Sequence, residues 1–337
     1  MDRQLQAQGF RIITLGPTST IGRVTRLRRF LTEERPDLIH TTIIESDIVG
    51  RMAAVGTGIP VVTSVVNTSY SPARLGDPQV SRWKLSAVKA IDGFTARHLT
   101  AGFHALTDTV ATATARELRV PRSAITVIPR GRDFDRLGQV THQRRTAVRR
   151  VLGIDEHDQV VLTVGRQEYQ KGHVVLVEAA ARLAATRPNL KILIAGRVGS
   201  QSKAIRDRIR RLNLVGVVEP LDHRDDVPDL FAAADLFAFP SLFEGFGGSL
   251  LEAMAMGLPA VVSDLPVFHE VAGSSVQYAP TNDAHSWADA MADLLDDPQA
   301  RDRLGASAKS RARRMYDVED VADAYEIWYR QFVSSKA

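Results

Sequence analysis

The chain has no cysteine among its 337 residues. Disulfide bonds and thiolate metal sites are therefore excluded, and the composition agrees with a reducing compartment. No apolar run approaches the roughly 20 residues that a helix needs to cross a bilayer, and the first residues carry no signal-peptide core. We therefore expect a cytoplasmic globular protein, and its length suits two domains.

Aromatic residues make up only 6% of the chain, and the basic stretches hold few of them. Because proteins bind single-stranded nucleic acids by stacking bases on aromatic rings, a nucleic-acid partner is not expected. Charge is also unevenly divided, because basic residues predominate in the first half and acidic residues in the second. Residues 1–150 carry 23 Lys and Arg against 12 Asp and Glu, whereas residues 151–337 carry 20 against 27. The first half is thus expected to meet something anionic, such as an acceptor or a membrane surface.

The basic residues form two dense clusters, which are Arg23, Arg26, Arg28, Arg29 and Arg144, Arg145, Arg149, Arg150. Solvated helix faces are one interpretation of both clusters. Arg23, Arg26 and Arg29 follow one another at intervals of three, so they share a face of a helix. This spacing favours a second interpretation, in which the first cluster docks on anionic lipid at the inner face of the membrane.

Short β-branched runs alternate with helical patterns throughout, which predicts α/β layers with parallel sheets. The runs lie at 11–16, 37–42, 60–66, 102–107 and 124–129, and then at 159–165, 190–196, 216–221, 236–240, 259–264 and 275–280. A polar, arginine-rich stretch at 130–150 is the best candidate for a linker. The pattern indicates two facing Rossmann-like domains with ligands at the carboxyl ends of their strands.

A glycine-rich loop with two Glu residues lies at 241–266, in SLFEGFGGSLLEAMAMGLPAVVSDLP. The glycines exclude regular helix until about Ser249, a good N-cap type, and Gly257-Leu258-Pro259 ends the helix. Bare backbone amides at such a helix start can bind phosphate. Glu244 and Glu252 on either side suit a phosphate compound with hydroxyls at both ends. The chain has no G-x-G-x-x-G after a strand, which counts against a nicotinamide oxidoreductase.

Two cations follow the run at 159–165, in VGRQEYQKG. Arg166 comes directly after the expected strand, and Lys171 precedes the next helix. Strand-to-helix turns are where open α/β sheets bind ligands, and a planar guanidinium with a point-charge ammonium can grip one diphosphate. Exposed loop cations are the alternative interpretation.

The EGFG…LLEAMAMGLPAVVS frame together with VGRQEYQKG resembles the nucleotide-sugar signature of retaining GT-B glycosyltransferases of the family-four type, the glycosyl transferases group 1. The resemblance implies catalytic roles for Glu244, Arg166 and Lys171. It implies that Glu252 binds the ribose hydroxyls and Glu244 those of the donor sugar. Backbone amides of Phe246 and Gly247 would serve the sugar, and those of Gly248 and Ser249 the diphosphate. No metal and no cofactor is expected.

The resemblance also marks positions in the first half. Many relatives have a His where Val66 stands, which leaves Asn67 as the polar candidate toward the donor. Arg130 and Arg132 occupy the joint and are candidates for the phosphate or an acidic acceptor. His40 is a candidate on the acceptor side or, alternatively, a core histidine at a strand end.

The expected domains are 1–138 on the acceptor side and 139–315 for the nucleotide sugar. The resemblance implies that a final helix at 318–333 crosses back and completes the first domain. Relatives usually begin with a strand and a glycine-rich loop before the residues that open this sequence, so the first domain is expected to be shortened at its start.

The expected function is transfer of a hexosyl group from a nucleoside diphosphate sugar to an acceptor hydroxyl with retention, in cell-envelope or surface glycan or glycolipid synthesis. The acceptor could be a glycan, a lipid-linked molecule or a small molecule. A catalytically impaired nucleotide-sugar-binding protein is the alternative.

Overall fold

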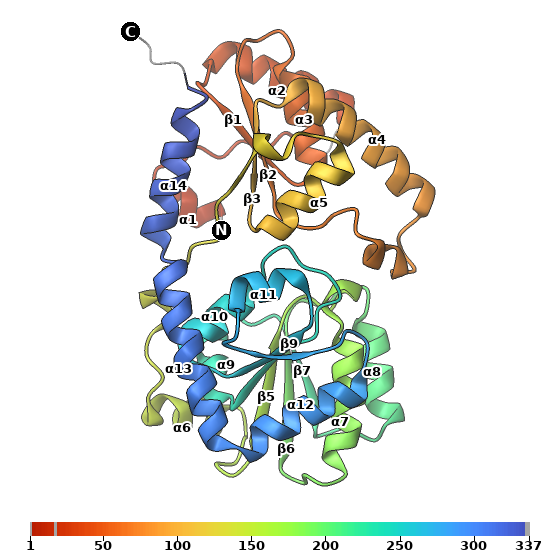
Figure 1. Cartoon of the computed structure of the whole chain (residues 1–337), viewed down its shortest axis with the longest axis vertical. Helices are drawn as coiled ribbons and strands as arrows, with labels where there is room; N and C mark the ends of the chain where they lie inside the picture. The colour runs from red at the N-terminus through yellow and green to blue at the C-terminus, as the bar shows by residue number, and fades with distance from the viewer. Residues whose placement is uncertain (1, 17–18, 334–337) are drawn as a thin grey trace.

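The structure is a computed structural model that describes residues 2–16 and 19–333. The chain folds into two α/β domains, one above the other in Figure 1, each built on a parallel sheet. The long C-terminal helices run from the lower domain into the upper one, so the last element of the chain belongs to the domain that the first elements build.

The N-terminal domain has a four-stranded parallel sheet in the order β1-β2-β3-β4. Its strands are β1 (Ile39–Thr42), β2 (Val61–Val65), β3 (Gly102–Ala105) and β4 (Ile125–Val127). Its helices are α1 (Asp2–Ala7), α2 (Thr20–Glu34), α3 (Ile44–Ala54), α4 (Arg82–Leu99) and α5 (Asp108–Leu118), with short 3-10 turns at Pro72–Gly76 and Arg122–Ala124. The expected runs at 37–42, 60–66, 102–107 and 124–129 thus contain the four strands.

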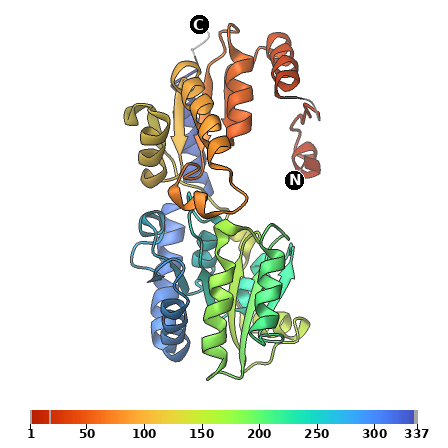
Figure 2. The ribbon, with the colours of Figure 1, turned by 90° about the vertical axis from the view of Figure 1, so that its right-hand side faces the viewer.

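The expected strand at 11–16 does not form, and that prediction is wrong. These residues are irregular, and β1 is an edge strand whose only pairing among the described residues is with β2. A strand is stabilised by a neighbour in the ladder. The segment instead lies beside α2, where Arg26 donates to the carbonyl of Leu15 at 2.8 Å. Figure 2 shows α1 and this segment standing apart from the sheet.

The C-terminal domain has a six-stranded parallel sheet in the order β10-β9-β8-β5-β6-β7. Its strands are β5 (Gln159–Val164), β6 (Leu190–Ala195), β7 (Val218–Asp222), β8 (Leu236–Phe239), β9 (Ala260–Ser263) and β10 (Gln277–Ala279). Its helices are α6 (His142–Val151), α7 (His173–Ala184), α8 (Ser202–Arg211), α9 (Val227–Ala233), α10 (Gly248–Met256), α11 (Pro266–Ala272), α12 (Ala284–Asp296) and α13 (Pro298–Met315). Each of the six expected runs overlaps a strand, and β7 extends one residue beyond the run at 216–221. Short 3-10 turns lie at Asp135–Leu137 and Tyr169–Lys171.

The central strands of this sheet are buried on both faces. All four residues of β8 and of β9 are buried, which is why they appear in the sequence as continuous apolar runs with no alternation. Phe134 and Leu137 already pack in this core. The crossing between the two sheets therefore precedes Phe134, a few residues before the expected boundary at 138.

The chain crosses between the domains twice, and the two crossings touch. The backbone amide of Arg132 donates to the carbonyl of Tyr316 at 2.9 Å, and Arg132 forms a parallel bridge with Asp317. Gly131 permits this approach, since a Cβ there would lie 2.9 Å from the Cα of Val318. The last helix, α14 (Val318–Arg330), then packs on the N-terminal sheet through Val321 and Trp328. The expected return of this helix is observed.

A hydrogen-bonded chain of side chains fixes α14 to that sheet. It joins the Tyr329 hydroxyl to His40 Nδ1, His40 Nε2 to Ser64 Oγ, Ser64 Oγ to His104 Nδ1 and His104 Nε2 to the carbonyl of Ile128, over distances of 2.6 to 2.7 Å. Burial lowers the pKa of His104 to about 4 and also lowers that of His40, which favours neutral imidazoles. Because a carbonyl can only accept, a neutral His104 has its proton on Nε2 and accepts from the Ser64 hydroxyl at Nδ1. Ser64 then accepts from His40 Nε2, and His40 Nδ1 accepts from the Tyr329 hydroxyl.

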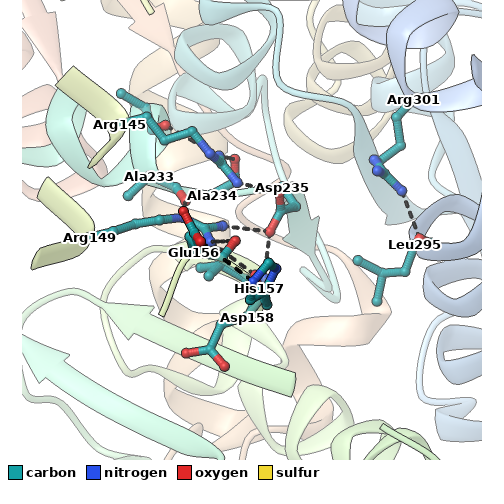
Figure 3. Close-up of polar contacts among 12 residues, drawn as sticks. Arg145, Arg149, Glu156, His157, Asp158, Ala233, Ala234, Asp235, Leu295 and Arg301 are labelled. Carbon is teal, nitrogen blue, oxygen red and sulfur yellow. Dashed lines mark hydrogen bonds and ion pairs between the residues drawn. The ribbon is translucent and has the colours of Figure 1, made fainter. Parts of the chain in front are cut away.

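Most of the second arginine cluster binds acceptors within the C-terminal domain, and Figure 3 shows two of its members, Arg145 and Arg149. Arg145 and Arg149 both bind the carboxylate of Asp235, at 2.5 and 2.8 Å. Arg149 is 4% exposed and also donates to the carbonyl of Ala233. Arg144 pairs with Asp229. Three of its four members therefore hold α6 on α9 and the start of β8, and only Arg150 is the solvated residue that the pattern also allowed.

No helix in the described part of the chain combines the length and the apolar character that crossing a bilayer requires.

Candidate functional site between the domains

The start of α10 lies at the cleft and has no side-chain cap. Its N-cap residue is Gly247, with φ 92°, and no side chain in the described part of the chain caps the first-turn amides. The helix begins at Gly248, one residue earlier than expected, and Ser249 is not the cap. The Ser249 hydroxyl instead donates to the carbonyl of Val164 at 2.9 Å, which ties α10 to the end of β5. Uncapped amides at a helix N-terminus attract an anion.

Lys171 and Glu244 form an ion pair at this helix start. Glu244 is 9% exposed and also accepts from the Ser241 hydroxyl at 3.3 Å. The Lys171 ammonium lies over the Phe239 ring, 4.9 Å from its centroid. Its methylenes run along Gly165, where a Cβ would lie 3.2 Å from Lys171 Cδ. The bare glycine thus lets the lysine reach the cleft from the turn after β5.

Arg130 and Arg132 bring two further cations to the same place. Their guanidinium groups lie 3.3 and 2.9 Å from the position that a Cβ of Gly248 would take. Arg132 Nε also binds Glu252 at 2.8 Å. The pKa of Arg130 is lowered from its usual value, first by desolvation and then by the charge of Arg132. Two adjacent like charges beside bare helix amides favour an anion.

Arg166, the other cation expected at the site, follows β5 in the chain. Its side chain is exposed, and no carboxylate among the described residues pairs with it. The structure thus gathers Lys171, Glu244 and Glu252 with Arg130 and Arg132, and no contact among the described residues joins the Arg166 side chain to them.

The loop that carries Glu244 touches the N-terminal domain directly. A Cβ on Gly245 would lie 2.0 Å from the carbonyl of Val66 and 2.7 Å from the Cα of Asn67. The Thr107 hydroxyl also donates to the carbonyl of Gly245 at 3.2 Å. Asn67 is therefore brought to the site across the cleft. Phe246 is 3% exposed, and its ring packs edge-on against Tyr316, so its side chain belongs to the core and its backbone to the loop.

A cavity of about 410 Å³ opens beside Glu244. It is lined by residues that follow β1, β2 and β3 in one domain and β8, β9 and β10 in the other, among them Ile44, Asn67, Thr109, Leu242, Glu244 and Pro266. The carboxyl ends of both sheets therefore face one another, as the Rossmann pattern predicts. His40 is not among the lining residues; it contacts α14.

Sequence reasoning missed a contact that holds the domains together. Glu270, on α11, accepts hydrogen bonds from the backbone amides of Asp108 and Thr109 and from the Thr109 hydroxyl. A carboxylate from one domain thus binds the N-terminus of α5 in the other, where the helix dipole favours negative charge. Thr107 at the helix start was a visible capping signal, but nothing in the sequence indicated a partner 162 residues away.

Two facing parallel-sheet domains, with a cationic helix start in the cleft and a C-terminal helix that returns to the first domain, define the GT-B class. Residues 144–311 match the family described as Glycosyl transferases group 1, and residues 2–131 match the Glycosyl transferase 4-like domain. The chain belongs to the group 1 glycosyltransferase family.

Two curated relatives illustrate the match. The chain is 30% identical over 314 residues to a D-inositol 3-phosphate glycosyltransferase of Pseudarthrobacter chlorophenolicus, covering 88% of this chain and 71% of the relative. It is 30% identical over 228 residues to the lipopolysaccharide core biosynthesis mannosyltransferase LpsB of Rhizobium meliloti, covering 65% and 64%. For several of the curated relatives the chain spans about half of their length.

Among solved structures, the fold is similar to that of Anabaena Alr3699/HepE in complex with UDP and glucose. The TM-score is 0.86, with 22% identity, and the match covers 98% of this chain and 88% of that protein. The expected GT-B fold is confirmed.

Proposed function

We propose that this protein transfers a hexosyl group from a nucleoside diphosphate sugar to an acceptor hydroxyl, with retention at the anomeric carbon. The observation that carries the proposal is the cluster at the start of α10. Lys171, Arg130 and Arg132 meet there around amides that no side chain caps. Three cations at a bare helix N-terminus suit a diphosphate, and Glu244 and Glu252 beside them suit hydroxyls at its two ends.

In the proposed reaction the acceptor oxygen bonds to the anomeric carbon while the bond from that carbon to the diphosphate oxygen breaks. The acceptor attacks the face from which the diphosphate leaves, and a phosphate oxygen takes its proton. Lys171, Arg166 and the α10 amides stabilise the charge that develops on the leaving diphosphate. Glu244 holds the sugar hydroxyls, and Glu252 the ribose hydroxyls. The proposal includes no metal ion, because protein cations hold the charge.

The acceptor is proposed to be a glycan or glycolipid of the cell envelope. The similar LpsB protein, described as a lipopolysaccharide core mannosyltransferase, supports this class. The alternative is a protein that binds nucleotide sugars and transfers nothing.

Calorimetric titration with UDP and GDP, beside a hydrolysis and transfer assay on UDP- and GDP-hexoses, separates the two functions. The proposal expects both binding and release of the nucleoside diphosphate. Binding without any turnover would favour the alternative, and the absence of both would remove the proposed function.

We also propose weak docking of the N-terminal domain on anionic lipid through α2. Arg23 and Arg29 are already paired with Glu45 and Glu33, at 2.6 and 2.8 Å. Each arginine near an anionic surface contributes about 1 kcal/mol to binding. Because two of these arginines are already paired with carboxylates, we expect a weak association that salt removes.

Sedimentation with neutral and with anionic vesicles, at low and at high salt, tests this docking. Replacing Arg23, Arg26 and Arg29 by Gln is expected to abolish a pelleted fraction seen only with anionic vesicles at low salt. Equal recovery of the wild-type protein in all four conditions would remove the membrane contact.

A further inference from the structure

Arg132 lies in the first crossing between the domains, and its side chain reaches the start of α10. Its backbone is fixed at the crossing, because its amide donates to the carbonyl of Tyr316 at 2.9 Å and Gly131 lies against Val318. Its Nε atom binds the Glu252 carboxylate at 2.8 Å, and its Nη1 atom donates to the carbonyl of Gly131 at 3.3 Å. One residue thus belongs to the crossing through its backbone and to the site through its side chain.

The position of this guanidinium is electrostatically unfavourable in the absence of an anion. Its Nη2 atom lies 2.9 Å from the point that a Cβ of Gly248 would take, beside helix amides that no side chain in the described part of the chain caps. Arg130 Nη1 lies 3.3 Å from the same point. A cation is disfavoured both at a helix N-terminus and beside a like charge. The ion pair with Glu252 is therefore the contact that stabilises Arg132 there.

The pair of Arg132 and Glu252 can exchange its partners. The two side chains are 28% and 24% exposed, whereas those of the buried pair Arg51 and Asp92 are 1% and 4% exposed. A solvated ion pair contributes little free energy, so a ligand that binds either partner can displace the other. Among the described residues, Arg132 is the only cation that pairs with Glu252.

We propose that Arg132 is a specificity-determining residue that exchanges Glu252 for a phosphate when a nucleoside diphosphate binds. The inference rests on the proposed function, which assigns the ribose hydroxyls to Glu252 and the diphosphate to the start of α10. A ligand that carries both groups gives Glu252 a ribose and Arg132 a phosphate oxygen in one event. A nucleoside must instead break the pair and leave Arg132 beside Arg130 without an anion. The pair thus selects against ligands that lack a phosphate.

Competition of unlabelled ligands against radiolabelled UDP or GDP tests the proposal. The competitors are uridine and UDP, or guanosine and GDP, according to which nucleoside diphosphate binds the wild type more tightly. Arg132→Gln removes the charge, Arg132→Lys keeps it, and Glu252→Gln breaks the pair from the other side. The matched control is Arg144→Gln, which breaks a pair of the same 2.8 Å length between Nε and the Asp229 carboxylate, at 23% and 42% exposure.

The two affinities of Arg132→Gln should change in opposite directions. Its affinity for the nucleoside should rise about three- to fivefold, because Glu252 no longer has to leave a cation. Its affinity for the nucleoside diphosphate should fall about three- to tenfold, because the lost hydrogen bond to phosphate outweighs the gain from a free Glu252. A merely structural pair would shift both affinities in the same direction.

The other variants should separate the two halves of the exchange. Arg132→Lys should restore most of the affinity for the nucleoside diphosphate, since an ammonium also binds phosphate. Glu252→Gln should weaken binding of the nucleoside, because the ribose loses a charged acceptor. Arg144→Gln should change neither affinity.

Inorganic pyrophosphate supplies a second measurement, because it offers Arg132 an anion without a ribose. In the wild type it should strengthen nucleoside binding by about threefold or more, since it frees Glu252. The same addition should leave nucleoside binding to Arg132→Gln unchanged. Ligand-observed NMR titration of the nucleoside, with and without pyrophosphate, measures this coupling.

Three results would overturn the inference. They are a nucleoside that binds Arg132→Gln no more tightly than the wild type, a nucleoside diphosphate that binds this variant as tightly, and pyrophosphate that leaves nucleoside binding to the wild type unchanged. The last measurement uses the wild-type protein, so it decides the question even where a variant does not fold. Failure of the proposed function is separately visible as the lack of UDP and GDP binding in the wild-type protein, and it would remove this inference as well.

Discussion

In the proposed reaction Lys171 and Arg166 both bind the diphosphate, but they lie in different environments, so their removal should affect binding alike and stability differently. Each Ala variant should weaken UDP or GDP binding by about 1.5–3 kcal/mol, the scale of a hydrogen bond to a charged group. Uridine and guanosine lack the phosphates, so their binding should be nearly unchanged. Titration calorimetry with the nucleoside and the nucleoside diphosphate measures this difference directly.

The two variants should separate in stability. Lys171 and Glu244 are 16% and 9% exposed, so removing the lysine leaves a nearly buried carboxylate without its cation. Breaking a fully buried pair costs about 3–5 kcal/mol. Because water reaches this pair through the cleft and Ser241 still donates to Glu244, we expect about 2 kcal/mol. Arg166 is exposed and unpaired, so Arg166→Ala should keep wild-type stability.

A double variant supplies the control for this reasoning. Replacing Lys171 by Met and Glu244 by Gln removes both charges and should recover most of the lost stability, while the affinity for the diphosphate stays low. Unchanged UDP and GDP affinity in both single variants would show that the phosphate assignment is wrong. A stability loss in Arg166→Ala but none in Lys171→Ala would contradict the pairing.

Three further predictions concern the domain contact, the metal and the pH. Glu270→Ala should lower stability by about 1–2 kcal/mol, since the N-terminus of α5 loses an acceptor, and it should enlarge the radius of gyration measured by small-angle scattering. An unchanged radius of gyration would contradict a role of Glu270 in holding the two domains together. Transfer activity should survive EDTA, and a loss restored by Mg²⁺ or Mn²⁺ would contradict the proposed mechanism. The pKa of His104 is lowered to about 4 in the folded protein, so the unfolded chain binds a proton at this residue more readily than the folded one. The free energy of unfolding should therefore fall by about 3 kcal/mol as the pH drops from 6.5 toward 4. Denaturant titrations of the wild type should show this pH dependence, and those of His104→Asn should lack it.

The sequence was sufficient to predict most of the fold, because the central strands of both sheets, such as β3, β8 and β9, are buried, largely apolar runs bounded by turn residues. The segment at 11–16 shows the limit of that reasoning. Its composition is that of a strand, but strand formation depends on a partner in the ladder, and local composition contains no information on the partner. The same holds for the cluster at 144–150. Its arginines look like a solvated or anion-binding face, whereas Arg149 is buried against Asp235, 86 residues away.

The candidate site was predictable to the extent that it is encoded in one continuous segment. Glu244, the glycines and Glu252 occur together at 244–252, and Lys171 belongs to a turn that follows a recognisable strand. Glu270 could not be found in this way. Its significance lies in what surrounds it in space, the N-terminus of a helix in the other domain. Nothing in its neighbours along the chain distinguishes it from surface carboxylates.

Under the proposed function, the pairing within the site explains why a whole nucleotide sugar would suit it better than either of its parts. Both carboxylates assigned to hydroxyls are held by cations assigned to phosphate, Glu244 by Lys171 and Glu252 by Arg132. A nucleoside alone would release Glu252 and leave Arg132 without an anion, and a free phosphate would take the cations and leave the carboxylates unpaired. In each case the free energy lost by breaking an ion pair offsets part of the free energy gained from the ligand. A nucleoside diphosphate sugar supplies hydroxyls and phosphates together, so it can replace both ion pairs in one step.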